Sequence, residues 1–368
     1  MSQQVANDKS SPAMQESAAQ RAALKQKLFP EGVPTLWCPS LTHYNSGGGI
    51  DGVRIAAHLR HLAPYVKGFL IPGSTSDGWE LTDAEFWQLL DIALEQTQRL
   101  GLHLLVGVLK ANTGEARETI GRVVEHLQRR TQERDAAAAL PKAGVCGFTV
   151  CAPRGQQVSQ AEMERGLVPI LELGLPIALY QLPQVTENEL SPELVCALAE
   201  RFPNFLLFKD SSGADRTVLC GKNLGGVFTM RGAEGDYARW LLAPAPARYD
   251  GFLLSTANCF AADLTQMISQ ANAERLEAAR VLSDRITRVT NEMFALARQL
   301  PGGIVYANAN KAIDHFFAHG PGAEKVSGPR LHSGSCLPPD LILKTGEVLR
   351  RYNLLPQRGY AAGTTTLL

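Results

Sequence analysis

Short apolar runs alternate with longer amphipathic stretches along most of the chain. The runs are about five residues long and lack the polar alternation of a half-exposed strand, which predicts strands buried on both faces, as in a parallel sheet. The expected strands are residues 35–38, 68–72, 103–108, 147–151, 176–181, 204–208, 227–231 and 251–255. Enough chain separates consecutive strands for helical crossovers, and Thr82 with Glu85 forms a capping box at the start of one crossover helix.

Eight strands joined by crossovers predict an α/β fold, a (β/α)8 TIM barrel with three additional C-terminal helices. We expect the barrel in residues 29–270, a length within the roughly 200 to 400 residues that this fold needs. The alternative, an open doubly wound sheet, is disfavoured because Gly47–Gly49 lacks the spacing of a dinucleotide-binding fingerprint.

The two ends of the chain differ from the repeating pattern. Residues 1–28 are polar and are expected to form a mobile or loosely docked extension. Residues 129–142 are expected to extend a helix and then form a surface loop. Residues 271–368 contain three helical patterns and are expected to form a C-terminal appendage. The expected helices span residues 273–300, 304–319 and 339–352.

Composition narrows the class of protein. The 368 residues carry no net charge, which gives no electrostatic reason to bind nucleic acid or an anionic membrane. No apolar run reaches the roughly 18 residues needed to cross a bilayer, and the N-terminal region lacks a secretory signal. The seven cysteines form no CxxC pair, which favours a reduced, cytoplasmic setting.

The strongest chemical signal is Lys209, which ends the apolar run Phe205–Phe208. Burial lowers the pKa of an amine, and a neutral amine is a nucleophile toward carbonyl groups. The alternative is a lysine whose stem packs on the strand while its ammonium reaches solvent. A second lysine, Lys110, also follows a strand and is the alternative candidate for the same chemistry.

In a barrel, active-site groups lie at the carboxyl ends of the strands. Tyr180 has the phenol to move protons beside Lys209, and other polar residues at these ends are suited to hold a carboxylate or a hydroxylated substrate. The candidate substrate-binding residues are Gly73, Ser74, Thr75, Ser76, Arg154, Gln181, Ser255 and Thr256. Together these groups match the needs of Schiff-base chemistry on a ketone.

Other polar residues carry weaker signals. Arg231 and Glu234 follow a strand and are expected either to line the distal pocket or to form a salt bridge at its rim. His315 and His319 are four residues apart, a spacing that can bind zinc, but no third ligand is near in the sequence, so we expect no metal. No cofactor is expected.

Four segments of the chain resemble the dihydrodipicolinate synthase and N-acetylneuraminate lyase superfamily. The family's strand-two motif, GTTGE followed by LT, is similar to residues 73–82 (GSTSDGWELT), and its YNxP motif is similar to residues 180–183 (YQLP). Its Schiff-base strand is similar to residues 203–213 (PNFLLFKDSSG), and GxxSxxAN is similar to residues 251–258 (GFLLSTAN). The resemblance implies a class I lyase that acts on pyruvate or another 2-oxo acid and assembles as a homodimer or homotetramer.

The departures from the family pattern concern the substrate. Dihydrodipicolinate synthases carry an arginine two residues after the proline of YNxP, where this chain has Val185, and a relay tyrosine from strand four, which this chain lacks. We therefore expect an aldolase or hydro-lyase for a 2-keto-3-deoxy sugar acid-like substrate, and not dihydrodipicolinate synthesis. The alternatives are a catalytically silent barrel that binds a 2-oxo acid or regulates a partner, and a metal-dependent barrel lyase.

Overall fold

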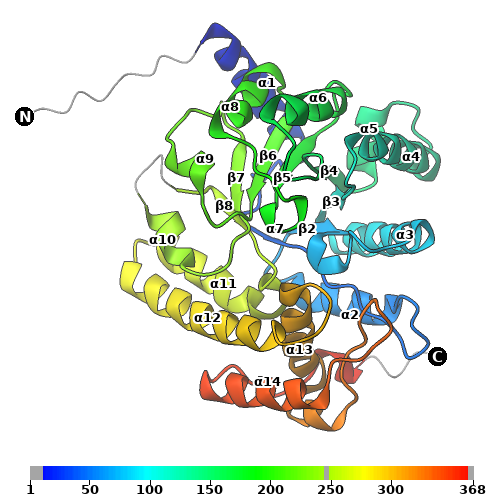
Figure 1. Ribbon diagram of the computed structural model, residues 1–368, viewed down its shortest axis with the longest axis vertical. Helices are drawn as coiled ribbons and strands as arrows, with labels where there is room; N and C mark the ends of the chain where they lie inside the picture. Colours follow the sequence, from blue (N-terminus) through cyan, green and yellow to red (C-terminus); the bar gives the residue numbers. More distant parts are fainter. Residues whose placement is uncertain (1–10, 244–247, 364–368) are drawn as a thin grey trace, which may run out of the picture.

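The computed structural model describes residues 11–243 and 248–363, in which parallel strands close into a barrel in sequence order (Figure 1). The strands are β1 (Leu36–Cys38), β2 (Gly68–Ile71), β3 (His103–Gly107), β4 (Val145–Cys151), β5 (Ile177–Gln181), β6 (Phe205–Asp210), β7 (Phe228–Arg231) and β8 (Gly251–Leu253). The pairing of β1 with β8 closes the sheet. The (β/α)8 barrel expected from the apolar runs is therefore confirmed.

Helices surround the barrel and extend beyond it at both ends. Those between the strands are α2 (Gly52–Leu62), α3 (Asp83–Leu100), α4 (Thr113–Thr131), α5 (Ala136–Lys142), α6 (Gln160–Leu171), α7 (Pro183–Thr186), α8 (Pro192–Arg201), α9 (Arg216–Leu219) and α10 (Tyr237–Leu242). The helix α1 (Pro12–Leu28) precedes the barrel, and α11 (Ala257–Asn272), α12 (Leu276–Ala297), α13 (Val305–His319) and α14 (Pro339–Arg351) follow it. The segment expected as a helix extension and loop instead contains α5, whose N-cap is Asp135.

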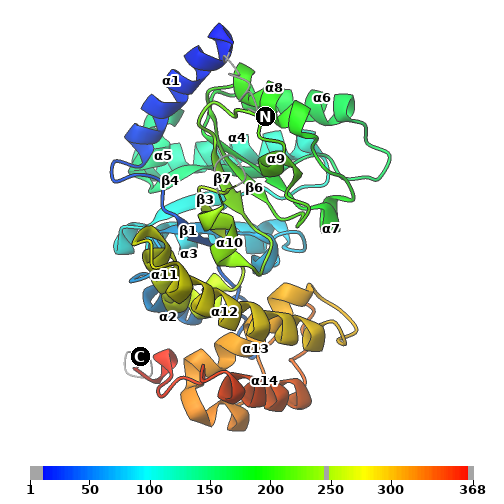
Figure 2. The same ribbon diagram turned by 90° about the vertical axis from the view of Figure 1, so that its left-hand side faces the viewer.

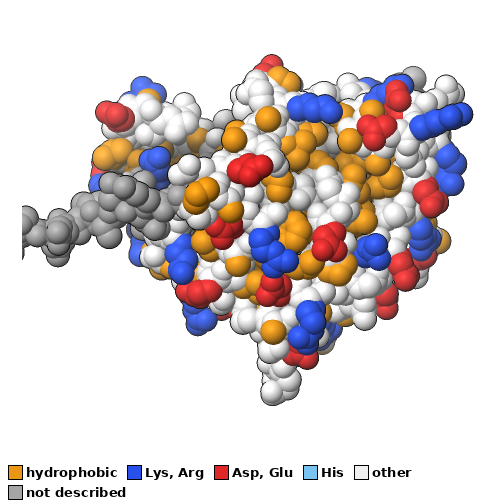
Figure 3. Space-filling view, turned by 90° about the horizontal axis from the view of Figure 1, so that it is seen from above, with side chains coloured by type: hydrophobic (Ala, Val, Ile, Leu, Met, Phe, Trp, Pro, Cys, Tyr) orange, Lys and Arg blue, Asp and Glu red, His pale blue; other side chains and the backbone are white. Residues whose placement is uncertain are grey.

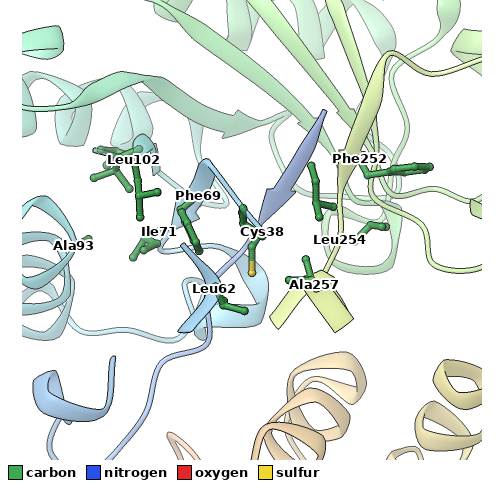
Figure 4. Packing of buried hydrophobic residues seen from close by; sticks show 14 of the residues in the cluster. Cys38, Leu62, Phe69, Ile71, Ala93, Leu102, Phe252, Leu254 and Ala257 are labelled. Carbon is green, nitrogen blue, oxygen red and sulfur yellow. The ribbon is translucent and has the colours of Figure 1, made fainter. Parts of the chain in front are cut away.

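Apolar side chains fill two layers. The larger layer lies between the strands and the outer helices, where Phe69 and Ile71 of β2 pack near Cys38 and Leu62 (Figure 4). A smaller cluster fills the barrel interior and includes Trp37. Gly68 leaves room for that indole, because a Cβ at this position would overlap the Trp37 ring. Each fully buried large side chain contributes roughly 1.5 to 3 kcal/mol, so both layers stabilise the frame that positions the strand ends.

Most of the N-terminal segment forms a helix that is docked on the barrel. Residues 12–28 form α1, which packs against α8 at the end of the barrel opposite the C-terminal helices (Figure 2). The reason is Arg21, which is fully buried and donates hydrogen bonds to the carbonyls of Phe205, at 2.7 Å, and of Gly225, Ala199 and Phe202. Residues 1–10 of the expected extension lie outside the described residues.

The C-terminal helices expected from the sequence are present, and buried polar contacts tie α13 to the barrel. Lys311 Nζ lies 2.8 Å from Asp77 Oδ2, and both side chains are nearly inaccessible to solvent. Three residues further along α13, Asp314 accepts hydrogen bonds from Arg54 of α2 and from Tyr360. Residues of the appendage therefore contact the loop that follows β2.

The surface carries no field of a single sign on the face seen from above, where acidic and basic side chains are interspersed with apolar ones (Figure 3). Among the helices of residues 11–243 and 248–363, none is long and apolar enough to cross a membrane.

Candidate active site

Lys209 lies at the carboxyl end of β6, in register with Tyr180 of β5 and Met230 of β7. Its side chain is only 4% exposed, and Nζ lies 4.0 Å from the centroid of the Tyr180 ring. Burial lowers the pKa of the Lys209 amine to about 7, although the nearby Glu234 carboxylate raises it. A large share of the lysine is therefore neutral and nucleophilic near neutral pH.

The position of the lysine depends on a glycine of the neighbouring strand end. The Lys209 side chain lies against Gly232, directly after β7, and a Cβ at that position would overlap Lys209 Cε and Ser211 Oγ. The absence of a side chain at residue 232 lets the lysine stem run along the backbone toward the cavity.

The lysine opens into a cavity of about 540 Å³. Strand ends and the loops that follow them contribute Thr75, Tyr180, Leu182, Gln184, Val185, Lys209, Gly232, Glu234 and Ser255. The C-terminal appendage contributes Asn291, Phe294, Arg298, Ile304, Val305 and Tyr306. Because α12 and α13 cover one side of the cavity, the substrate would contact both the barrel and the appendage.

Tyr180 is buried, and its phenol lies 3.5 Å from Ser74 Oγ. The Ser74 hydroxyl accepts a hydrogen bond of 2.9 Å from Trp79 Nε1, which leaves its own proton free to be directed at the Tyr180 oxygen. Burial, followed by the nearby phenol of Tyr306, raises the pKa of Tyr180 well above its usual value. Tyr180 is therefore protonated at neutral pH and is a potential hydrogen-bond donor.

Glu234 is a fixed carboxylate on the cavity wall. It accepts hydrogen bonds from Ser255 Oγ at 2.7 Å, Thr256 Oγ1 at 2.6 Å, the Thr256 amide at 3.1 Å and the Tyr237 phenol at 2.9 Å. These four donors hold the carboxylate in one orientation. The rim salt bridge expected between Arg231 and Glu234 is wrong, because Arg231 pairs with Asp215 at 2.9 Å.

The site residues predicted from the sequence, catalytic and substrate-binding, divide into those that line the cavity and those that do not. The cavity is lined by Thr75, Tyr180, Lys209 and Ser255. Ser74 does not line it but contacts the phenol of Tyr180, which does. Thr256 lies one layer behind, where it holds Glu234. Gly73 packs against Pro39 and Leu70, and its amide donates to Ser76.

Three of the expected substrate-binding side chains have other partners. Ser76 donates to the Ser40 carbonyl, and Gln181 donates to Asp210 and Glu189 while it accepts from the Leu190 amide. Arg154 is half-exposed and lies 3.0 Å from Glu187 in an ion pair. These contacts stabilise loops at the barrel mouth, and none of the three residues is among the lining residues of the cavity.

The weaker candidates lie outside the cavity. Lys110, the alternative nucleophile, is not among its lining residues. His315 lies with Nε2 2.9 Å from the Ala323 carbonyl, so this ring donates to the backbone. The described residues contain no group of three side chains placed to hold a metal ion.

Several cavity residues were not singled out in the sequence. Asn291 and Phe294 of α12 and its C-cap residue Arg298 recur at three- and four-residue spacing, which marks one face of a helix but gives no indication of what that face contacts. Tyr306 lies in the first turn of α13, which follows a Pro-Gly-Gly segment, and the packing of the appendage brings it to the cavity that Lys209 lines.

A buried lysine with a lowered pKa, facing a phenol at the carboxyl end of a closed (β/α)8 barrel, defines the class I lyase type of site. A model of the dihydrodipicolinate synthetase family matches residues 129–311. The chain resembles this family, and it is a lyase of the class I type.

The relatives carry different activities. A 4-hydroxy-tetrahydrodipicolinate synthase of Stenotrophomonas maltophilia is 28% identical over 250 residues, covering 67% of this chain and 76% of that protein. A probable 5-dehydro-4-deoxyglucarate dehydratase of Corynebacterium glutamicum is 25% identical over 62% of this chain and 68% of that protein. The relatives therefore agree on the family and not on the substrate.

Solved structures show the same fold. A prophage protein of the dihydrodipicolinic acid synthase family from E. coli K12, in complex with pyruvate, superposes with a TM-score of 0.68 at 19% identity, over 87% of this chain and 98% of that chain. A variant of the 2-keto-3-deoxygluconate aldolase of Sulfolobus solfataricus gives a TM-score of 0.66 at 15% identity, over 87% and 96% of the two chains.

Proposed function

We propose that the protein cleaves or dehydrates a 2-oxo acid through an imine on Lys209. The observation that carries this proposal is the buried amine itself, with a pKa of about 7, at the floor of the cavity beside Tyr180. The neutral amine attacks the ketone carbon, the ketone oxygen takes up a proton, and the resulting hydroxyl leaves as water when the imine forms.

The remaining groups at the floor have complementary roles. Tyr180 donates the proton that the departing hydroxyl requires, and Ser74, 3.5 Å from the phenol, orients it. The Thr75 hydroxyl, together with the backbone amides of the loop after β2, holds the carboxylate next to the ketone. The fixed Glu234 carboxylate accepts a hydrogen bond from a substrate hydroxyl.

The outer part of the cavity favours a hydroxylated chain of the 2-keto-3-deoxy sugar acid type. Asn291 can bind hydroxyl groups as donor and as acceptor. Arg298 is exposed at the mouth and has no ion-pair partner among the described residues, so it is available for an anionic group at the far end of the chain. The names of the relatives, which include a dehydratase of 5-dehydro-4-deoxyglucarate, support a substrate of this type.

Condensation of pyruvate with aspartate semialdehyde fits the cavity less well. The half-buried Val185 lines the wall where synthases of the family carry an arginine for the second carboxylate. The carboxylate of aspartate semialdehyde at that wall would lack a charge-assisted hydrogen bond, which contributes roughly 1.5 to 3 kcal/mol to binding. We expect negligible rates with this aldehyde in an assay coupled to dihydrodipicolinate reductase, and a kcat/KM above about 10⁴ M⁻¹s⁻¹ would overturn this choice of substrate.

The test of the imine is reduction with borohydride in the presence of single 2-oxo acids, followed by intact-mass analysis and peptide mapping. Pyruvate and a panel of 2-keto-3-deoxy sugar acids should add their reduced mass to Lys209, and Lys209→Met should remove the adduct. Lys110→Met is the matched control and should retain it. An adduct on Lys110, or binding of the acids without any adduct, would instead support a different nucleophile or a silent binding barrel.

A further inference from the structure

A second phenol reaches the cavity from the C-terminal appendage. Tyr306 lies in the first turn of α13, and its ring packs beside Phe294 of α12 with centroids 6.5 Å apart. Its backbone carbonyl accepts a hydrogen bond of 2.7 Å from Asn310 Nδ2, and the same nitrogen donates to Ser255 Oγ at 3.0 Å. The first turn of α13 is therefore anchored to the end of β8, which fixes the phenol relative to the strand ends.

The Tyr306 hydroxyl is available to a ligand. No side chain or backbone group of the described residues forms a hydrogen bond with it, and it is not among their buried unsatisfied atoms, so it meets the open space of the cavity. A phenol that is half-buried in a packed wall and has no protein partner must satisfy its hydrogen-bonding capacity with water or substrate.

The two phenols of the cavity differ in their access to solvent. Tyr180 is only 3% exposed, whereas Tyr306 is half-buried at the wall that leads to the mouth. Tyr180 and Tyr306 line the same cavity, Tyr180 beside Lys209 and Tyr306 on the wall formed by α13. A proton that Tyr180 gives to the substrate is replaced most directly from this side.

We propose that Tyr306 is a second catalytic phenol, which connects the buried Tyr180 to solvent through the cavity. This inference rests on the imine chemistry proposed above. When the carbinolamine on Lys209 loses water, its C–O bond breaks and Tyr180 gives a proton to the departing hydroxyl. Tyr306, directly or through one water, then gives a proton to the Tyr180 phenolate and takes one from solvent at the mouth.

The experiment compares Tyr306→Phe with the wild type and with Tyr352→Phe, which removes the phenol of a half-buried tyrosine of the appendage outside the cavity. Two quantities are measured with pyruvate as the probe. One is the rate at which the borohydride-reducible adduct on Lys209 accumulates after mixing, and the other is the exchange of the pyruvate methyl protons in D2O, followed by NMR. Thermal unfolding of each variant checks the fold.

We expect Tyr306→Phe to form the same final amount of adduct at the same half-saturating pyruvate concentration, but about 10-fold to 100-fold more slowly, and Tyr352→Phe to match the wild type. A structural role would change adduct yield, pyruvate affinity or unfolding instead of the rate alone. Rates for Tyr306→Phe within twofold of the wild type would overturn the inference and leave the proposed imine intact. A wild type that forms no adduct at all would overturn both.

Discussion

Replacement of Lys209 by methionine should make the folded protein more stable at neutral and mildly acidic pH while it removes the imine. Methionine has a similar length and no charge, so it keeps the packing of the stem against Gly232. The wild-type lysine must either be buried as a cation or lose its proton on folding. Both are unfavourable below the pKa of a free lysine.

The magnitude follows from the shift in pKa. The amine titrates near 10.5 in the unfolded chain and at about 7 in the folded protein. Between these values the unfolded chain binds one proton more than the folded one, so wild-type stability rises with pH across this window. The cost at pH 7 and below is at most about 4 to 5 kcal/mol, at about 1.4 kcal/mol for each tenfold change in the equilibrium.

Urea unfolding at pH 6.5 and at pH 9.5 tests this reasoning. The Lys209→Met variant should be more stable than the wild type by about 2 to 4 kcal/mol at pH 6.5, and by distinctly less at pH 9.5. Lys110→Met, which replaces a half-buried lysine outside the cavity, should change stability little at either pH. Equal stability of Lys209→Met and wild type at pH 6.5, or a gain that grows with pH, would show that the lysine is not desolvated as described.

Three further changes test other parts of the structure. Tyr180→Phe keeps the ring beside Lys209 but removes the proton donor, so the steady-state rate on any accepted substrate should fall by about 10² to 10⁴ with unchanged unfolding, and a loss below about threefold would assign the proton to another group. Arg21→Met leaves backbone carbonyls without their donor and should destabilise the fold by about 2 to 5 kcal/mol in urea, whereas the same change at the exposed Arg117 of α4 should cost little. Lys311→Met leaves Asp77 buried without a cation and should cost about 3 to 5 kcal/mol, and the double variant with Asp77→Asn should recover part of that loss if the ion pair is the cause.

The strands and the central lysine could be predicted because their signals are local. An unbroken apolar run followed by lysine can be recognised without knowledge of what packs around it, and the order of the strand ends places Tyr180 and Lys209 side by side. α1 could not be predicted from its polar sequence. The helix is held in place by tertiary contacts, in which Arg21 donates hydrogen bonds to the backbone carbonyls of Phe205 in β6 and of Gly225.

The part of the cavity wall that the appendage forms could not be predicted from the sequence either. Tyr306 and Arg298 reach the cavity only through the tertiary packing of α12 and α13, and the sequence around them carries no catalytic pattern. Arg154 illustrates a different limit, because its place after a strand predicts a binding role, whereas in the structure it forms an ion pair with Glu187. Position along the chain locates the strand ends, but the partners of long charged side chains depend on loops whose course the sequence leaves open.

The buried contacts of α13 bear on how the molecule comes apart. Within four turns this helix carries a phenol at the cavity, an amide bound to Ser255, a cation bound to Asp77 and an anion bound to Arg54. Detachment of the helix would leave buried charges without partners on both the helix and the barrel. A folded barrel that lacks its C-terminal segment would therefore have a high free energy. The C-terminal hundred residues and the barrel therefore form one cooperative unit, and a protease that cuts between α12 and α13 should release no stable barrel core.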